Sequence, residues 1–314
     1  MIVVNILAPI FLLIGLGLFL RRQGFASEEF FRNLNRLIYW IALPALLFTK
    51  TASALPQLNT ALGIIAVVLA GMVVCIGVGY LLAWRLRLDK RATASFVQGA
   101  YRGNIAFVGL PVVLYALAAV GQGTPEVEAL VLLALAPVIP VYNVAAVIVL
   151  AGATPAENRN GRQQVGAVMR GIATNPLIIA CLAGLAIAYS GLALPEALTR
   201  TLDLLGELAL PGALLAMGAG LRLRAIRTGG GTATAASLVK VLVAPLAGYL
   251  AARMIGLTGP SLLIAMLLLA MPTAVASYVM AQAMGADDTL ASSIVMISTL
   301  LAIPVLSVIL LAAV

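Results

Sequence analysis

Long hydrophobic runs, separated by short polar or charged segments, dominate the chain. Several of them reach the length of about 20 residues that a helix needs to cross about 30 Å of hydrocarbon. We therefore predict an all-α membrane protein with ten transmembrane helices. Their approximate ranges are 4–21, 30–49, 61–84, 93–119, 127–151, 165–190, 198–221, 232–255, 261–285 and 289–312.

The fourth run contains residues that do not suit an uninterrupted membrane helix. Its segment RGNIAFVGLP, residues 102–111, holds an arginine, an asparagine, two glycines and a proline. Unpaired backbone groups are costly in lipid, and a helix break at membrane depth is tolerated where it faces protein or a water-filled cavity. The segment therefore indicates a broken helix beside such a cavity.

Composition agrees with a protein embedded in the bilayer. Hydrophobic residues make up 63% of the chain and charged residues 10%, against about a quarter charged in soluble domains. Arg21 and Arg22 follow the first run and no positive charge precedes it, so we interpret this run as a retained helix and not as a cleaved signal peptide. Cys75 and Cys181 lie within apolar runs as small fillers, and nothing in the pattern suggests a metal site or a cofactor.

The basic residues are distributed unevenly between the two sides of the predicted membrane. When the adjoining helix ends are counted with each connection, connections after even-numbered helices hold only Lys50, Arg200 and Arg253. Connections after odd-numbered helices hold the larger group: Arg21, Arg22, Arg32, Arg36, Arg85, Arg87, Lys90, Arg91, Arg159, Arg162, Arg170, Arg222, Arg224 and Arg227. The positive-inside rule assigns the richer side to the cytoplasm and places both termini outside. This placement accounts for the net charge of +8 without a nucleic-acid partner.

Two pairs of motifs suggest an internal repeat. IALPALL at 41–47 is similar to LALPGALL at 208–215, and VGYLLAWRLRL at 78–88 is similar to AGYLAARMIGL at 247–257. The second pair is offset by 169 residues. Since five helices per repeat is an odd number, the two halves would cross the membrane in opposite directions, as in the inverted repeats of secondary transporters.

We predict a first five-helix repeat at 1–152, a cytoplasmic linker at 153–164 and a second, inverted repeat at 165–314. The offset of 169 carries Asn104 onto Thr273, inside the segment AMPTAVASYV of the ninth predicted helix. Paired interruptions in corresponding helices are typical of a binding site near the membrane midplane.

The most specific of these motifs resemble the auxin efflux carrier family. The resemblance covers essentially the whole chain and is carried by GNIAFVGLPV, NPLIIACLAGL, LVKVLVAPLAG and the long segment from AMPTAVASYV to LLAIPV. It implies helices 4 and 9 that cross at their breaks, and elevator-like movement of a transport domain against a scaffold, each drawn from both repeats. It also implies a small organic anion, auxin-like or a mono- or dicarboxylate, as the substrate. The bile acid–sodium symporter fold is similar at a greater distance.

Within this resemblance, Asn104 matches the family's asparagine in helix 4 and Pro272 its proline in helix 9. The distant sodium symporters use a glutamate in helix 9, whereas no acid lies between Pro272 and Asp287 here. Sodium coupling is therefore disfavoured and a proton is the preferred coupling ion.

Eight residues around the two breaks are candidates for substrate binding. Asparagine can donate and accept hydrogen bonds, and an arginine can pair with a carboxylate in bidentate fashion. Arg102 is also open to another interpretation, as an interfacial residue that reaches the cytoplasm. Thr273 and Ser277 are expected to share a helical face. The candidates are Arg102, Gly103, Asn104, Pro272, Thr273, Ser277, Tyr278 and Gln282.

Three charged residues are candidates for coupling or charge compensation. Lys240 lies deep in the eighth helix, where a cation is costly. It is either a substrate counter-charge or proton carrier, or the ion-pair partner of Asp203 or Glu207 in helix 7. Asp203 and Glu207 share one face of helix 7 at a spacing of four. Because the chain has no histidine, Glu207 is the candidate proton carrier.

A secondary active transporter of a small organic anion is thus the favoured function. The alternatives are a sodium-coupled symporter of the bile acid type and a channel or substrate-sensing receptor. An enzyme is disfavoured, because no metalloprotease, serine hydrolase or Walker A motif occurs. We expect a bacterial inner-membrane protein with the lipid bilayer around it, and a homodimer is compatible with the sequence.

Overall fold

The computed structural model describes residues 2–53, 58–153, 174–222 and 230–313. This part of the chain is entirely helical, apart from turns and one isolated bridge between two residues. Most of the predicted linker at 153–164 and the predicted start of the sixth helix lie outside these residues.

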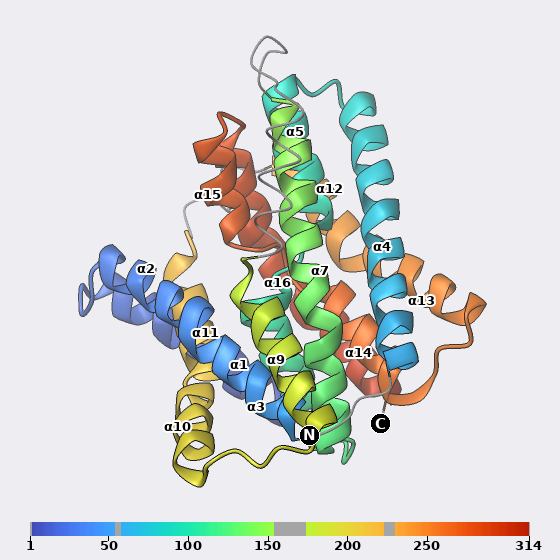
Figure 1. The fold of residues 1–314 in the computed structure, drawn as a ribbon. Coiled ribbons are helices and arrows are strands. Elements are labelled where there is room, and N and C mark those ends of the chain that lie inside the picture. Colours follow the sequence, from blue (N-terminus) through green and yellow to red (C-terminus); the bar gives the residue numbers. More distant parts are fainter. Residues whose placement is uncertain (1, 54–57, 154–173, 223–229, 314) are drawn as a thin grey trace. The chain divides into compact units, whose positions relative to one another are not determined.

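The helices of the N-terminal half follow the predicted ranges, some of them in two or three pieces (Figure 1). Their bounds are α1 Ile2–Arg22, α2 Glu28–Leu37, η1 Ile38–Ala42, α3 Leu43–Ala52, α4 Leu58–Arg85, α5 Lys90–Tyr101, η2 Ile105–Gly109, α6 Leu110–Ala119 and α7 Pro125–Ala151. The segments labelled η are π-helical.

The C-terminal half has the same mixture of long and divided helices. Their bounds are α9 Pro176–Ser190, α10 Glu196–Glu207, α11 Ala209–Gly220, α12 Gly230–Leu238, η5 Val239–Val243, α13 Ala244–Met254, α14 Gly259–Ala270, α15 Ala276–Ala283 and α16 Asp288–Ala313. The side chain of Asp287 accepts a hydrogen bond from the amide of Leu290 at 2.9 Å, so this acid caps the N-terminus of α16.

A proline follows each described π-helical segment at the same distance. Pro44, Pro111 and Pro245 each lie two residues after the end of η1, η2 and η5, respectively. A proline ring clashes with the carbonyl four residues earlier and provides no amide proton. Widening of the preceding turn into a π-helix relieves this clash while keeping the helix continuous.

The described chain divides into two compact units, each drawn from both halves of the sequence. Unit 1 comprises residues 1–62, 106–140 and 166–220, and unit 2 comprises residues 63–105, 141–165 and 221–314. Both predicted repeats therefore contribute to both units.

Unit 1 is built around very close helix pairs. The Cα of Gly17 in α1 faces the backbone of Leu215 in α11, and an added Cβ would lie 2.0 Å from that carbonyl oxygen. Gly218 of α11 meets the carbonyl of Ile14 in the same way, at 1.9 Å. Glycines at a helix interface let two backbones approach each other, as is common in membranes.

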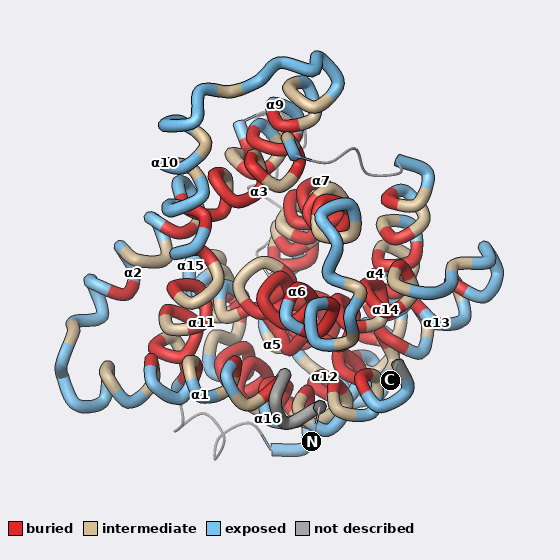
Figure 2. The backbone as a smooth tube through the Cα atoms, turned by 90° about the horizontal axis from the view of Figure 1, so that it is seen from below, coloured by how far each residue is buried: buried red, intermediate tan, exposed pale blue. Residues whose placement is uncertain are grey.

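Unit 2 holds α5 against α12, α15 and α16. Every residue from Ala94 to Ile105 is buried (Figure 2). Gly99 lies against the side chain of Ile294 of α16, where an added Cβ would be 2.8 Å away. The second half of α5 is thus enclosed on all sides, and this enclosure fixes the first helix break in the interior of unit 2.

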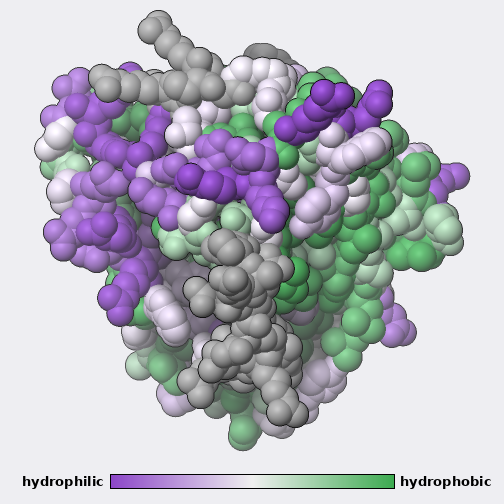
Figure 3. Space-filling view, turned by 90° about the horizontal axis from the view of Figure 1, so that it is seen from above, coloured by the Kyte–Doolittle hydropathy of each residue, from purple (hydrophilic) through white to green (hydrophobic). Residues whose placement is uncertain are grey.

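Large hydrophobic side chains remain exposed over broad areas of the surface (Figure 3). Five of the described helical stretches are long and apolar enough to cross a membrane: Leu58–Arg85, Pro125–Ala151, Glu196–Gly220, Gly230–Met254 and Asp288–Ala312. Exposed apolar surface on this scale requires a lipid environment.

Candidate functional site

Both predicted helix breaks are present, and both lie in unit 2. The first comprises Arg102–Asn104, between α5 and η2, and the second comprises Met271–Val275, between α14 and α15. The backbone leaves the helical conformation at Arg102, with φ −76° and ψ 88°, and at Met271, with φ −59° and ψ 142°.

The two breaks pair with each other through their backbones. Gly103 and Thr273 form an antiparallel bridge. The amide of Asn104 donates to the carbonyl of Pro272 at 2.7 Å, and the amide of Ala274 donates to the carbonyl of Arg102 at 2.9 Å. Groups that the helices leave unpaired thus find partners in the opposite break, as the membrane interior requires.

Thr273 fixes the second break to two other helices. Its hydroxyl donates to the carbonyl of Gly99 in α5 at 2.8 Å, and its amide donates to the hydroxyl of Ser298 in α16 at 3.0 Å. Thr273 itself is fully buried. The position that the repeat offset singled out is therefore a structural junction of three segments.

Arg102 lies in the interior and does not reach solvent, since its exposed fraction is 6%. Its Nη2 donates to Oδ1 of Asn143 in α7 at 2.6 Å. The Nη1 atom is buried and makes no hydrogen bond to any described residue. The interfacial interpretation of this arginine does not fit its burial.

Lys240 is fully buried in η5, and its ammonium group donates to the carbonyl of Leu269, in the last turn of α14. A Cβ added to Gly103 would lie 3.1 Å from Cε of Lys240 and 3.4 Å from its Nζ. The lysine therefore contacts both broken helices. A cation at the C-terminal end of a helix is favourably placed in the field of the helix dipole.

Within the residues that the structure describes, the two buried cations have no buried acid beside them. Among the described residues, the buried polar set includes Arg102 and Lys240 but neither aspartate nor glutamate. The ion pairs found in this part of the chain, Arg21–Glu28, Lys50–Glu128 and Arg200–Glu196, involve neither of them. The surroundings of the paired breaks thus carry an excess of positive charge.

The remaining candidates near the second break differ in burial. Ser277 is buried, and its hydroxyl has no hydrogen-bond partner among the described residues. Tyr278 is half-buried, with the guanidinium of Arg222 at 4.2 Å from its ring centre. Gln282 is exposed. The expectation that Thr273 and Ser277 share a helical face is wrong, because α15 begins only at Ala276.

Asp203 and Glu207 lie on α10 in unit 1, and both are exposed. Lys240 belongs to unit 2, and its ammonium group donates to the backbone carbonyl of Leu269. The alternative interpretation of this lysine, as the partner of an acid in helix 7, stays a prediction. Within the described residues, no group of three or more acids and cysteines could hold a metal ion.

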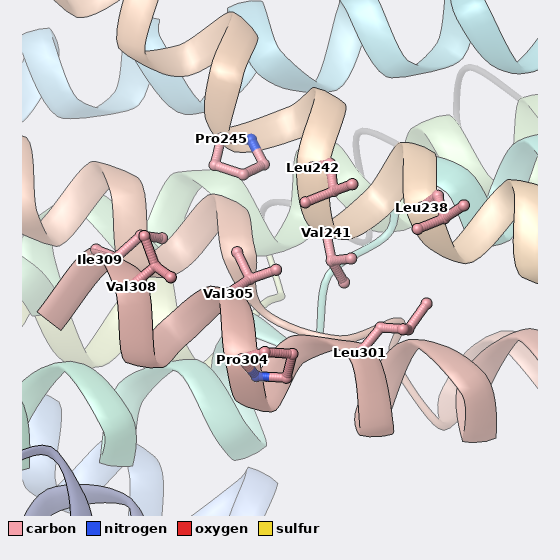
Figure 4. Close-up of a pocket in the computed structure, with 9 residues that line it drawn as sticks. All are labelled: Leu238, Val241, Leu242, Pro245, Leu301, Pro304, Val305, Val308 and Ile309. Carbon is pink, nitrogen blue, oxygen red and sulfur yellow. The ribbon is translucent and has the colours of Figure 1, made fainter. Parts of the chain in front are cut away.

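A separate groove in unit 2 has a volume of 390 Å³ and lies between η5, its neighbouring turns and α16 (Figure 4). All of its lining side chains are aliphatic or proline: Leu238, Val241, Leu242, Pro245, Leu301, Pro304, Val305, Val308 and Ile309. It offers no side-chain group that could bind an anion, and we do not include it in the site.

The eight candidates for substrate binding that the sequence singled out include neither Asn143 nor Gln98. Gln98 is fully buried in α5, four residues before Arg102. A polar residue at that spacing from a buried arginine, in an apolar helix, is the signal that could have revealed it.

The long apolar helices and the exposed hydrophobic surfaces are those of a multi-pass membrane protein. A family model described as a membrane transport protein matches residues 2–310, and the chain therefore belongs to this family, the auxin efflux carrier family. Its members are transport proteins and not enzymes, and they carry small molecules across the membrane.

Two relatives extend over nearly the whole chain. A protein of Rhizobium meliloti (strain 1021) with the name "Putative malonate transporter" is 31% identical over 314 aligned residues, which cover 96% of this chain and 92% of the relative. An uncharacterized transporter of Methanocaldococcus jannaschii is 22% identical over 306 residues, which cover 95% of each chain.

Proposed function

We propose that the protein is a secondary active transporter of a small organic anion, which binds where the two helix breaks meet. The observation that carries this proposal is the backbone pairing of Arg102–Asn104 with Pro272–Ala274, beside two buried cations and, within the described part of the chain, no buried acid. An unpaired charge at membrane depth costs at least a few kcal/mol. A bound anion would compensate Arg102 and Lys240.

The pairing pattern supports an inverted repeat with helices that cross at their breaks. An offset of 169 residues carries Gly103 onto Pro272 and Asn104 onto Thr273. The same offset relates the contact between Gly103 and Thr273 to a contact between Pro272 and Asn104. Both contacts are present. A local two-fold relation of this kind is expected when two halves of opposite orientation meet.

We propose alternating access by an elevator-type movement, with unit 2 as the transport domain and unit 1 as the scaffold. Unit 2 contains both breaks and both buried cations, so the whole binding region can move as one body. The close glycine contacts between α1 and α11 support a rigid scaffold in unit 1.

A dicarboxylate such as malonate is the substrate class that we favour. The name of the Rhizobium meliloti relative points to malonate, and two carboxylates would balance the charges of Arg102 and Lys240. Arginine and lysine both form strong charge-assisted hydrogen bonds to carboxylates. We place the chain in the bacterial inner membrane and keep a homodimer as its proposed assembly.

Uptake by purified protein in proteoliposomes tests the function. Radiolabelled malonate, succinate and acetate would be offered with an imposed proton gradient, a sodium gradient or no gradient. We expect malonate to accumulate above its equilibrium level with the proton gradient. Downhill flux alone, at channel-like rates and without accumulation under either gradient, would contradict secondary active transport. Accumulation with sodium alone would favour the bile acid type of coupling.

A further inference from the structure

A stripe of polar residues runs along α5 toward the first break. Arg91, Ser95, Gln98 and Arg102 follow one another at spacings of four, three and four, so they lie on one face of the helix. Arg91, at the exposed end, donates to the carbonyls of Gly285 and Ala286 at 2.8 and 3.3 Å. The other three are buried. Nothing in the proposed transport site so far makes use of Gln98.

The buried part of this stripe contains several polar atoms without partners. Both amide atoms of Gln98 and Nη1 of Arg102 make no hydrogen bond to any described residue, and neither does the hydroxyl of Ser277. Buried polar atoms are almost always hydrogen-bonded in native proteins, because each unpaired one is costly. So many in one region indicate a polar ligand.

The register between α5 and α15 brings Gln98 level with Ser277. At the break, Ala274 donates to the carbonyl of Arg102 at 2.9 Å. Farther along, Ala94 and Ala281 belong to the same buried cluster. Gln98 lies one turn from Arg102 toward Ala94, and Ser277 lies about one turn from Ala274 toward Ala281. Both side chains therefore occupy the same level between these two contacts.

Helix α7 lies beside the region of Gln98 and Ser277, at the same level along α5. Asn143 binds Arg102 at one end, and at the other Leu150 belongs to the same buried cluster as Ala94 and Ala281. The residue between them on that face is Ala146, whose small side chain is fully buried. Arg102 directly follows α5, and its amide still donates to the carbonyl of Gln98 at 3.0 Å, so Arg102 stays in register with Gln98, one turn farther along.

We propose that Gln98, Ser277 and Nη1 of Arg102, named here the Gln98 cluster, bind one carboxylate of the transported anion. The proposal rests on the proposed function, and it extends the binding region one helical turn from the breaks. A carboxylate can accept hydrogen bonds from the amide, the hydroxyl and the guanidinium together. Water could satisfy the amide and the hydroxyl, but it would leave the arginine without a counter-charge.

The first experiment removes the amide while keeping the shape of the side chain. We expect Gln98→Met to raise the Kd for malonate by about tenfold or more, measured by calorimetry on purified protein, since hydrogen bonds to charged groups are among the stronger ones. Ser277→Ala should also raise the Kd for malonate, and it provides the test if Gln98→Met fails to fold. The matched control is Ser95→Ala, which removes an equally buried hydroxyl one turn farther from Arg102 and should leave the Kd unchanged.

The second experiment needs no added ligand. Gln98→Glu places a carboxylate beside Arg102, so we expect it to melt at a higher temperature than the wild type and to lose stabilisation by malonate. If Gln98→Glu melts lower and still gains stability from malonate, the cluster is only hydrated and the proposal is wrong. An unchanged Kd in Gln98→Met would overturn it equally.

These results separate the cluster from the transport site as a whole. Loss of malonate binding in Asn104→Ala, with normal binding in Gln98→Met, would leave the proposed function standing and reject the cluster. If the wild type binds neither malonate, succinate nor acetate, the proposed substrate class fails, while the melting temperature of Gln98→Glu still decides whether a carboxylate fits beside Arg102.

Discussion

At the scale of single residues, Asn104 is singled out both by the repeat in the sequence and by its hydrogen bond at the paired breaks. Its backbone holds the second break, and its side chain is buried beside the junction. We expect Asn104→Ala to abolish malonate uptake while the protein keeps its melting temperature within a few degrees, because the bridging amide is unaffected. Uptake at the wild-type rate would mean that the junction is purely structural.

Lys240 offers a test of charge compensation. We expect Lys240→Met to raise the apparent KM for malonate by about tenfold, equivalent to about 1.4 kcal/mol, with little loss of stability. An unpaired buried cation contributes little to stability, and its replacement by an apolar side chain of similar size is often tolerated. The matched control is Lys50→Met, which removes a partly exposed lysine paired with Glu128 at 2.8 Å. A normal KM with a much lower melting temperature would instead show that Lys240 stabilises the protein through its hydrogen bond to α14.

Glu207 remains the candidate proton carrier, although it lies on α10 in unit 1 and is exposed. If it carries the coupled proton, Glu207→Gln should flatten the dependence of malonate uptake on pH, and Asp203→Asn, one turn away, should not. An unchanged pH profile in Glu207→Gln would exclude proton coupling through this helix.

At this scale the sequence singled out candidate residues but did not show which residues they contact. Asn104 and Thr273 stood out through their place in the repeat, but the hydrogen bond between Arg102 and Asn143 joins residues 41 positions apart. Such a contact depends on tertiary packing, which no local pattern encodes. The role of Leu269 is carried by its backbone carbonyl, and a backbone group has no sequence signature.

At the scale of elements, the proline that follows η5 sets the position of Lys240. Without Pro245 the missing amide is restored and the ring clash is removed, so the π-helical turn can relax to an α-helix and rotate the lysine away from Leu269. We expect Pro245→Ala to raise the KM for malonate about as much as Lys240→Met does. Pro44→Ala changes the same motif in unit 1 and should leave the KM unaltered. Equal effects of both substitutions would point to general helix damage.

The ranges of most described helices could be predicted, because membrane thickness dictates the length of each apolar run. The breaks were predictable as well, since glycine, asparagine and proline interrupt those runs. The π-helical turns were not predicted, because a proline in a membrane helix is equally compatible with a simple kink. The division of helix 7 between Glu207 and Ala209 was likewise missed.

At the scale of the whole molecule, orientation is the main prediction that the sequence alone supports. In a variant with Cys75 and Cys181 replaced by alanine, we expect a cysteine at position 157 to react only from the cytoplasmic side and Gln122→Cys only from the outside. The uneven distribution of basic residues is the physical reason. Labelling of position 157 from outside would show that the orientation is the opposite of the predicted one.

The pairing of Gly103 with Thr273 has a consequence for how the protein can move. Amides in a loop ordinarily exchange with deuterium quickly, but those of Asn104 and Ala274 are bonded across the two breaks at 2.7 and 2.9 Å and should exchange as slowly as amides in the middle of a helix. Slow exchange there would make the junction a rigid hub and not a hinge. The flexing that opens and closes the pathway would then have to occur elsewhere in the chain, and the residues that exchange fastest would show where.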